Sequence, residues 1–186
     1  MLILASQSLR RAELLRNAAI EFRVQPANIP EERREGEKPI DYVCRLAREK
    51  ALTVRKQLDD DSVALGADTI VLLEDVVMEK PTSAADASAM LLMLAGRTHQ
   101  VMTGVCLAGN SFVDVGAEVT EVSFSPISDQ EIAAYVRSGE PMDKAGAYAI
   151  QGIASRWIAG LNGCYFNVVG LPVPLVYRML RARKLL

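Results

Sequence analysis

The chain has 186 residues and a formal net charge of −2, with 50% hydrophobic and 24% charged residues. It is long enough for one globular domain with a proper core, or for two lobes that share one sheet. The near-neutral charge argues against a nucleic-acid binder held by bulk charge, and no apolar run approaches the roughly 20 residues that span a bilayer. The cysteines, Cys44, Cys106 and Cys164, are too scattered for a disulfide framework or a zinc site, which favours the cytoplasm.

The opening stretch joins a buried strand to a helix through a polar turn. Leu2 to Ala5 is wholly apolar, Ser6-Gln7-Ser8 breaks the run, and a helical pattern starts at Leu9 with Ser8 as its N-cap. Backbone N–H groups and the positive end of the helix dipole make such a turn suitable for an anion. Arg10 and Arg11 lie where that dipole disfavours cations by about 0.3–1 kcal/mol. They indicate an anion site, with a solvated arginine pair as the alternative. They also follow the apolar start too soon for a signal peptide.

The next segment predicts a strand, a charged loop and a helix. A weak alternation over residues 21–25 is compatible with a strand, and residues 31–38 form an exposed charged loop whose side chains are mostly solvated. Pro39 suits the first turn of a helix whose apolar stripe recurs every 3.6 residues. Lys50 falls on this stripe. Its side chain either extends out to solvent or points into a polar cleft, and the pattern leaves both open.

Residues 63–73 predict a central strand with one carboxylate, Asp68, in the middle of an apolar run. A buried carboxylate is too costly to leave unpaired, so Asp68 needs a metal ion, a cation or a proton. Asp68 is therefore a candidate functional residue, and a structural salt bridge is the alternative.

The remaining segments predict further α/β elements without a repeat or a linker. They are a helix capped by Thr82 or Ser83 and closed near Gly96, strands over residues 99–108 and 112–124 joined at Gly109-Asn110, a helix from the capping box at Ser128, a polar loop over residues 140–152, strand-like segments over residues 153–161 and 165–171, and a last helix opened by Pro172 and Pro174. The only histidine, His99, has no partner motif and is expected to be structural.

The charged residues suit work on a polyphosphate. Arginines at the opening turn and lysines at positions 50, 80 and 144 accompany the lone strand carboxylate Asp68. A polyphosphate needs several cations and a metal ion that bridges its oxygens, and its hydrolysis needs a base that activates water. The inventory indicates a phosphate-ester or anhydride hydrolase. Since neither a P-loop nor a GxGxxG pattern is present, it does not say which one.

Seven motifs, spread over nearly the whole chain, resemble those of the Maf family of nucleoside triphosphate pyrophosphatases. They are Ser6-Gln7-Ser8-Leu9-Arg10-Arg11, Arg45-Leu46-Ala47-Arg48-Glu49-Lys50-Ala51, Gly66-Ala67-Asp68-Thr69-Ile70-Val71, Glu79-Lys80-Pro81, Gly96-Arg97-Thr98-His99-Gln100-Val101, Asp143 to Tyr148 with Ile150-Gln151-Gly152, and Asn167 to Pro172. The chain departs from the family pattern in having Leu9 for proline, Ala149 for glycine and Cys164 for serine, and none of these removes a catalytic group.

The resemblance implies a fold and an activity. The fold is α/β, an elongated mixed sheet with flanking helices and two lobes around a central cleft, similar to inosine triphosphate pyrophosphatases, in a single Maf-like domain over residues 1–186. The activity is hydrolysis of a nucleoside triphosphate to the monophosphate and pyrophosphate with a divalent metal cation, Mg²⁺ or Mn²⁺. The expected protein is a cytoplasmic homodimer that binds neither nucleic acid nor a membrane.

The resemblance also implies roles for individual residues. Asp68 corresponds to the family's proton acceptor, and Ser6, Arg11, Glu31, Lys50 and Lys80 correspond to residues that hold phosphate or metal. Asp68 and Glu31 are the expected metal ligands.

Three further residues, Arg10, Thr69 and Gln151, match the branch of the family that prefers dTTP and UTP. The branch that acts on 7-methyl-GTP tends to have Trp, Gln and Glu at these positions.

Two other functions compete with this interpretation. A nucleotide-binding regulator of cell division and septum formation would not need Asp68 as a base. An inosine or xanthosine triphosphate pyrophosphatase would share the fold but is not expected to carry these motifs. Whether the physiological substrate is a canonical or a modified pyrimidine triphosphate is left open.

Overall fold

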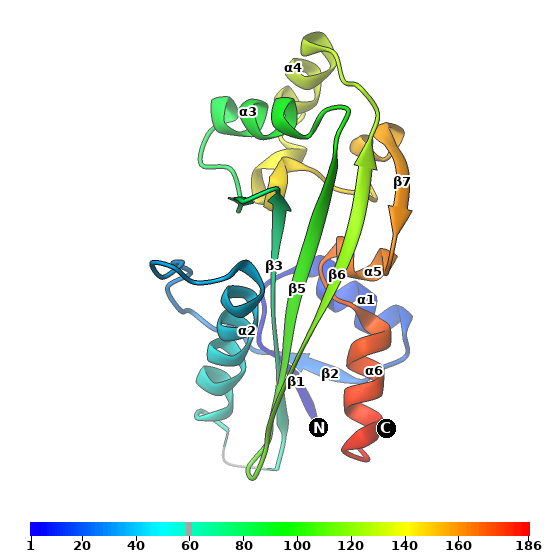
Figure 1. Ribbon diagram of the computed structural model, residues 1–186. Coiled ribbons are helices and arrows are strands. Elements are labelled where there is room, and N and C mark those ends of the chain that lie inside the picture. The colour runs from blue at the N-terminus through cyan, green and yellow to red at the C-terminus, as the bar shows by residue number, and fades with distance from the viewer. Residues whose placement is uncertain (59–60) are drawn as a thin grey trace. The chain divides into compact units, whose positions relative to one another are not determined.

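The computed structural model describes residues 1–58 and 61–186, and it shows a mixed α/β fold (Figure 1). The described strands form a seven-stranded sheet in the order β2-β1-β3-β5-β6-β7, with β4 paired to β3. Their bounds are β1 Leu2–Leu4, β2 Phe22–Val24, β3 Val63–Leu73, β4 Val76–Met78, β5 Thr98–Ala108, β6 Val113–Phe124 and β7 Ile158–Asn162. β1 runs parallel to β2 and β3, whereas β4 and β7 run antiparallel to β3 and β6. The mixed sheet predicted from the sequence is confirmed.

Helices flank this sheet, as predicted. The α-helices are α1 Leu9–Asn17, α2 Pro39–Arg55, α3 Ala84–Leu94, α4 Asp129–Arg137, α5 Tyr165–Val169 and α6 Val173–Ala182, and short 3₁₀ helices are η1 Glu140–Asp143, η2 Ala145–Ala147 and η3 Ile153–Trp157. None of the helices in the described ranges is long and apolar enough to cross a bilayer.

The chain divides into two compact units. The first unit contains Met1–Asp68, Thr103–Glu118 and Gly170–Leu186, and the second contains Thr69–Met102 and Val119–Val169. One boundary between the units falls between Asp68 and Thr69. Some of the candidate site residues predicted from the sequence therefore belong to the first unit and the others to the second.

Local signals predicted most element boundaries correctly. The Ser8 hydroxyl accepts the Arg11 N–H and caps α1, and Ser128 and Glu131 form the expected capping box of α4. β3 has the predicted bounds, and α2 begins at Pro39.

The prediction of strands over residues 153–161 and 165–171 is wrong in part for the first segment and wrong for the second. In the first, Ile153–Trp157 is a 3₁₀ helix and only Ile158–Asn162 is a strand; in the second, Tyr165–Val169 is the helix α5. Short apolar runs do not distinguish a strand from a buried helical turn. The turn of α5 is fixed from outside the segment, because the buried Asn167 amide donates to the Val101 carbonyl and to the Thr120 hydroxyl.

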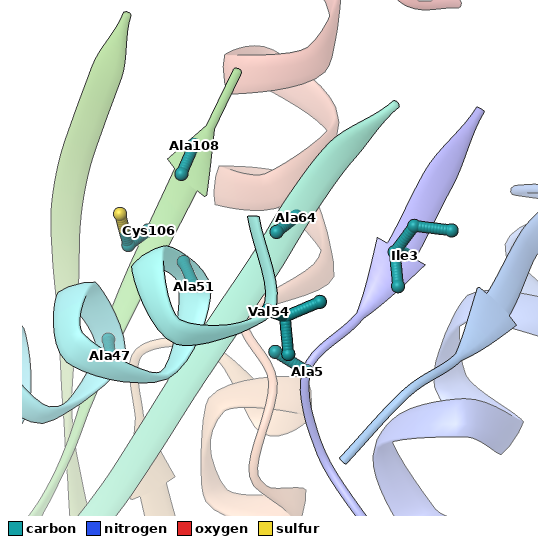
Figure 2. Close-up of a cluster of buried hydrophobic side chains, with 8 residues drawn as sticks. All are labelled: Ile3, Ala5, Ala47, Ala51, Val54, Ala64, Cys106 and Ala108. Carbon is teal, nitrogen blue, oxygen red and sulfur yellow. The ribbon is translucent and has the colours of Figure 1, made fainter. Parts of the chain in front are cut away.

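Small residues let α2 lie directly on the strands of the first unit. Figure 2 shows the buried cluster at this contact, with α2 residues facing residues of β1, β3 and β5 and the residue that follows β1: Ile3, Ala5, Ala47, Ala51, Val54, Ala64, Cys106 and Ala108. A Cβ added to Gly66 would lie 2.0 Å from the Ala47 carbonyl oxygen, so only glycine permits this approach. Lys50 lies one helical turn after Ala47, and Asp68 lies two residues after Gly66. The same contact therefore brings Lys50 to Asp68.

Candidate active site

Lys50 links two carboxylates in the first unit. Its ammonium nitrogen lies 2.6 Å from Asp68 Oδ1 and 2.5 Å from Glu31 Oε1. The side chains of Lys50 and Asp68 are only 7% and 10% exposed, whereas that of Glu31 is 42% exposed. Lys50 thus points inward to acidic partners, which decides between the two orientations left open by the sequence. The buried Asp68 has the cationic partner that it was predicted to need.

The turn between β1 and α1 supplies Ser6, and the first turn of α1 supplies Arg11. Arg11 donates from Nη1 to the Ser6 hydroxyl at 3.2 Å and from Nε to the Gly170 carbonyl at 2.8 Å. Burial lowers the pKa of the Arg11 guanidinium, and the nearby carboxylates of Asp68 and Glu31 oppose that shift. Arginine remains protonated in proteins. The start of α1 therefore holds a permanent cation close to the carboxylates of Asp68 and Glu31.

Arg10 lies beside Arg11 in the first turn of α1 and is half-buried. Its charge acts on Arg11 and contributes to the lowering of the Arg11 pKa. The two arginines at the helix start therefore repel each other, and an anion bound between them would relieve that repulsion.

The residues present fit a divalent metal ion. Glu31 and Asp68 each have an oxygen within hydrogen-bonding reach of the same Lys50 nitrogen, so both oxygens lie near one point. In the described ranges, no group of three or more His, Cys, Asp or Glu side chains could hold a metal. Mg²⁺ is commonly bound by only one or two carboxylates, with waters and substrate phosphates as its other ligands. Two carboxylates therefore fit such an ion.

The loop that carries Glu31 is anchored to α2 by residues that the sequence did not single out as functional. The Tyr42 hydroxyl donates to the Glu31 carbonyl at 3.1 Å, and Arg45 donates to the Glu32 carbonyl at 3.0 Å. Arg45 also binds both carboxylate oxygens of Glu37, at 2.6 and 2.8 Å, and these hydrogen bonds lower the Glu37 pKa to about 2. Glu37 is therefore an exception to the predicted solvated charge run. The signal for it was Arg45, within the Arg45-to-Ala51 motif.

Thr69, Lys80 and Gln151 belong to the second unit. Thr69 is half-buried on β3, Lys80 is exposed after β4, and Gln151 is exposed in a turn that the Gly152 N–H closes on the Ala149 carbonyl at 3.1 Å. Ala149 is not among the residues with positive φ, so alanine is compatible with the backbone here. The substrate contacts of these three residues stay predictions.

His99 has the surroundings of a structural residue. It is buried, its Nε2 lies 2.8 Å from the Tyr148 hydroxyl, and its ring meets those of Phe124 and Tyr148 edge to face. Burial lowers the His99 pKa to about 4, so the ring is neutral at pH 7.

Removal of the Lys50 charge should destabilise the first unit. Lys50→Met leaves Asp68 buried without its cation, and loss of one partner of a buried pair costs about 3–5 kcal/mol. In urea unfolding, the double variant Lys50→Met/Asp68→Asn should lose less stability than the two single variants combined. Arg34→Met is the control, because the Arg34–Glu49 pair is exposed and should contribute less than about 1 kcal/mol. Equal stability of Lys50→Met and the unmodified protein would contradict the assigned pairing.

Comparisons with known proteins bear on this site. Residues 1–183 match the family model described as "Maf-like protein". A protein of Koribacter versatilis (strain Ellin345), named dTTP/UTP pyrophosphatase, is 56% identical over 97% of this chain and 93% of its own length. A protein of Clostridium perfringens (strain 13 / Type A) with the same name is 43% identical over 96% of this chain and 94% of its own.

The fold also has a solved relative. The structure of the Staphylococcus aureus Ham1 protein superimposes on this chain with a TM-score of 0.55 and 13% sequence identity. The aligned part covers 98% of this chain and 98% of the Ham1 chain. This likeness shows a common fold.

Proposed function

The chain belongs to the Maf family, and on this premise we propose that it is a nucleoside triphosphate pyrophosphatase that hydrolyses dTTP and UTP to the monophosphate and pyrophosphate. The observation that carries the proposal is the cluster in which the buried Lys50 joins the buried Asp68 to the more exposed Glu31, with Arg11 close by. Its residues supply a base, metal ligands and cations for phosphate, the groups that phosphoanhydride hydrolysis requires.

In this proposal Asp68 accepts a proton from the attacking water. The water oxygen bonds to the α-phosphorus, the bond from that phosphorus to the bridging oxygen breaks, and pyrophosphate leaves. Ser6, Arg11 and Lys50 hold phosphate oxygens. The planar guanidinium of Arg11 suits phosphate oxygens, since charge-assisted hydrogen bonds from arginine to phosphate are strong and directional.

Asp68 and Glu31 would hold Mg²⁺ or Mn²⁺, which would supply positive charge to offset that of the phosphate groups. The cluster of Arg11, Lys50, Asp68 and Glu31 has no net charge by itself. A divalent cation would leave it with two positive charges for the triphosphate. This balance supports a metal ion bound together with the substrate.

The roles of the second-unit residues rest on the resemblance. Lys80 holds a phosphate oxygen, and Thr69 and Gln151, together with Arg10 of the first unit, select a pyrimidine base. Residues 1–186 act as one Maf-like domain in a cytoplasmic homodimer. The free thiols of Cys44, Cys106 and Cys164 support a reducing compartment.

The test is a product assay over a substrate panel. The purified protein is incubated with dTTP, UTP, CTP, ITP and 7-methyl-GTP in the presence of Mg²⁺ or Mn²⁺, and with EDTA as the control. We expect pyrophosphate and the monophosphate in equal amounts, fastest from dTTP and UTP. Binding of dTTP without turnover would instead favour a nucleotide-responsive regulator, and a preference for ITP would favour the purine enzyme.

A further inference from the structure

Two residues of the second unit, Tyr135 and Glu140, hold the turn that carries Gln151. Tyr135 lies in the last turn of α4 and is fully buried, and Glu140 is the first residue of η1. Neither was a candidate from the sequence. Gln151 itself is exposed and lies between Ala149 and Ile153, whose amides both bind this pair.

The Tyr135 hydroxyl and the Glu140 carboxylate form a connected set of hydrogen bonds. Tyr135 donates to Glu140 Oε1 at 2.8 Å, and its oxygen accepts the Ala149 N–H at 3.2 Å. The Glu140 carboxylate accepts the Ile153 N–H at 3.0 and 3.3 Å. The backbone is thus held by hydrogen bonds two residues before and two residues after Gln151.

Glu140 also explains why glycine follows Gln151. A Cβ added to Gly152 would lie 2.2 Å from Glu140 Oε1 and 2.6 Å from Oε2. The φ of Gly152 is −102°, so the glycine serves close approach and not a left-handed backbone. The carboxylate therefore packs against the main chain of the turn as well as binding it.

The main chain of Glu140 is fixed in turn. The Lys144 ammonium donates to the Glu140 carbonyl and to the Asp143 carboxylate, both at 2.5 Å. The Lys144 side chain is only 13% exposed, so this lysine, a candidate phosphate ligand by composition, is engaged inside the loop.

We propose that Tyr135 and Glu140 are positioning residues for base selection, acting through Gln151. This inference rests on the proposed function, in which Gln151 reads the pyrimidine. An amide selects a base only if its acceptor and donor meet the base edge together, which requires placement within about 0.5 Å. A long, exposed side chain has that placement only if its backbone is fixed. Tyr135 and Glu140 fix it from both sides.

The test compares base selectivity in Tyr135→Phe and Glu140→Ala. We expect the ratio of kcat/KM for UTP to that for CTP to fall about tenfold, as for loss of one hydrogen bond to a charged group, chiefly through a raised KM for UTP. Amide hydrogen exchange at Ala149 and Ile153 should become faster in both variants. Glu74→Gln is the matched control, because Glu74 is an exposed glutamate of the same unit that pairs with Arg97 at the surface. It should leave the ratio unchanged.

A second comparison isolates the contact itself. Gly152→Ala should reduce the UTP-to-CTP ratio in the unmodified protein, where the new methyl group meets the carboxylate. It should have little further effect in Glu140→Ala, where that carboxylate is gone. Additive effects of the two substitutions would contradict the packing role of Glu140.

Gln151→Ala separates failure of this inference from failure of the proposed function. If Gln151→Ala loses selectivity while folded Tyr135→Phe and Glu140→Ala retain it, the positioning role is wrong and the function stands. If Gln151→Ala keeps the selectivity, Gln151 does not read the base, and the inference falls with that role.

Discussion

Asp68→Asn should lower kcat for dTTP by about 10²–10⁴-fold, the contribution typical of a general base. Asparagine keeps the shape of the side chain and an oxygen that accepts from Lys50, whose ammonium lies 2.6 Å from Asp68. It loses the negative charge and the ability to take a proton from water. The measurement is steady-state hydrolysis of dTTP at saturating metal ion concentration, with urea unfolding to verify that the variant is folded.

Asp61→Asn is the matched control for this substitution. Asp61 is an exposed aspartate of the same unit, and it accepts a hydrogen bond from the Asn110 amide. Its replacement should leave kcat unchanged. Retention of more than about a tenth of the activity in Asp68→Asn would show that Asp68 is not the base.

Gln151→Glu should reduce kcat/KM for dTTP and UTP by several orders of magnitude. Uracil and thymine present an N3–H donor flanked by two carbonyl acceptors, and a glutamine amide can pair with the donor and one carbonyl together. A carboxylate would face a base carbonyl with no proton to donate. Sites built to hydrogen-bond one pattern discriminate against another by up to about 10⁴–10⁵-fold.

The measurement for Gln151→Glu is kcat/KM for dTTP, UTP, CTP and 7-methyl-GTP in both forms of the protein. A modest gain on 7-methyl-GTP is expected, because guanine offers N1–H and an amino group to two carboxylate oxygens. That gain should increase when Arg10 is replaced as well. An unchanged order of substrates would rule out base recognition by Gln151.

Local chemistry explains which parts of the fold the sequence could predict. The Ser8 and Ser128 caps, Pro39 and the apolar run of β3 depend on near neighbours in the chain, and all are present as expected. The segment of α5 was misassigned because its conformation depends on the buried Asn167, whose partners are 47 and 66 positions away in the sequence.

The sequence indicated which types of residue the candidate site would contain. It did not indicate which of those residues pair with one another. The stripe of α2 included Lys50 but left the direction of its side chain open, because its partners depend on the close approach of Ala47 to Gly66, which no periodicity reveals. The Arg45–Glu37 and Tyr135–Glu140 contacts could not be predicted from the sequence either. A charged residue in a loop is expected to be solvated unless the position of its partner is known.

The most direct test of the proposed reaction is hydrolysis of dTTP in ¹⁸O-labelled water with Mg²⁺, followed by mass spectrometry of both products. Attack on the α-phosphorus predicts one ¹⁸O atom in dTMP and none in pyrophosphate. Label in pyrophosphate, or release of orthophosphate with dTDP, would contradict the account.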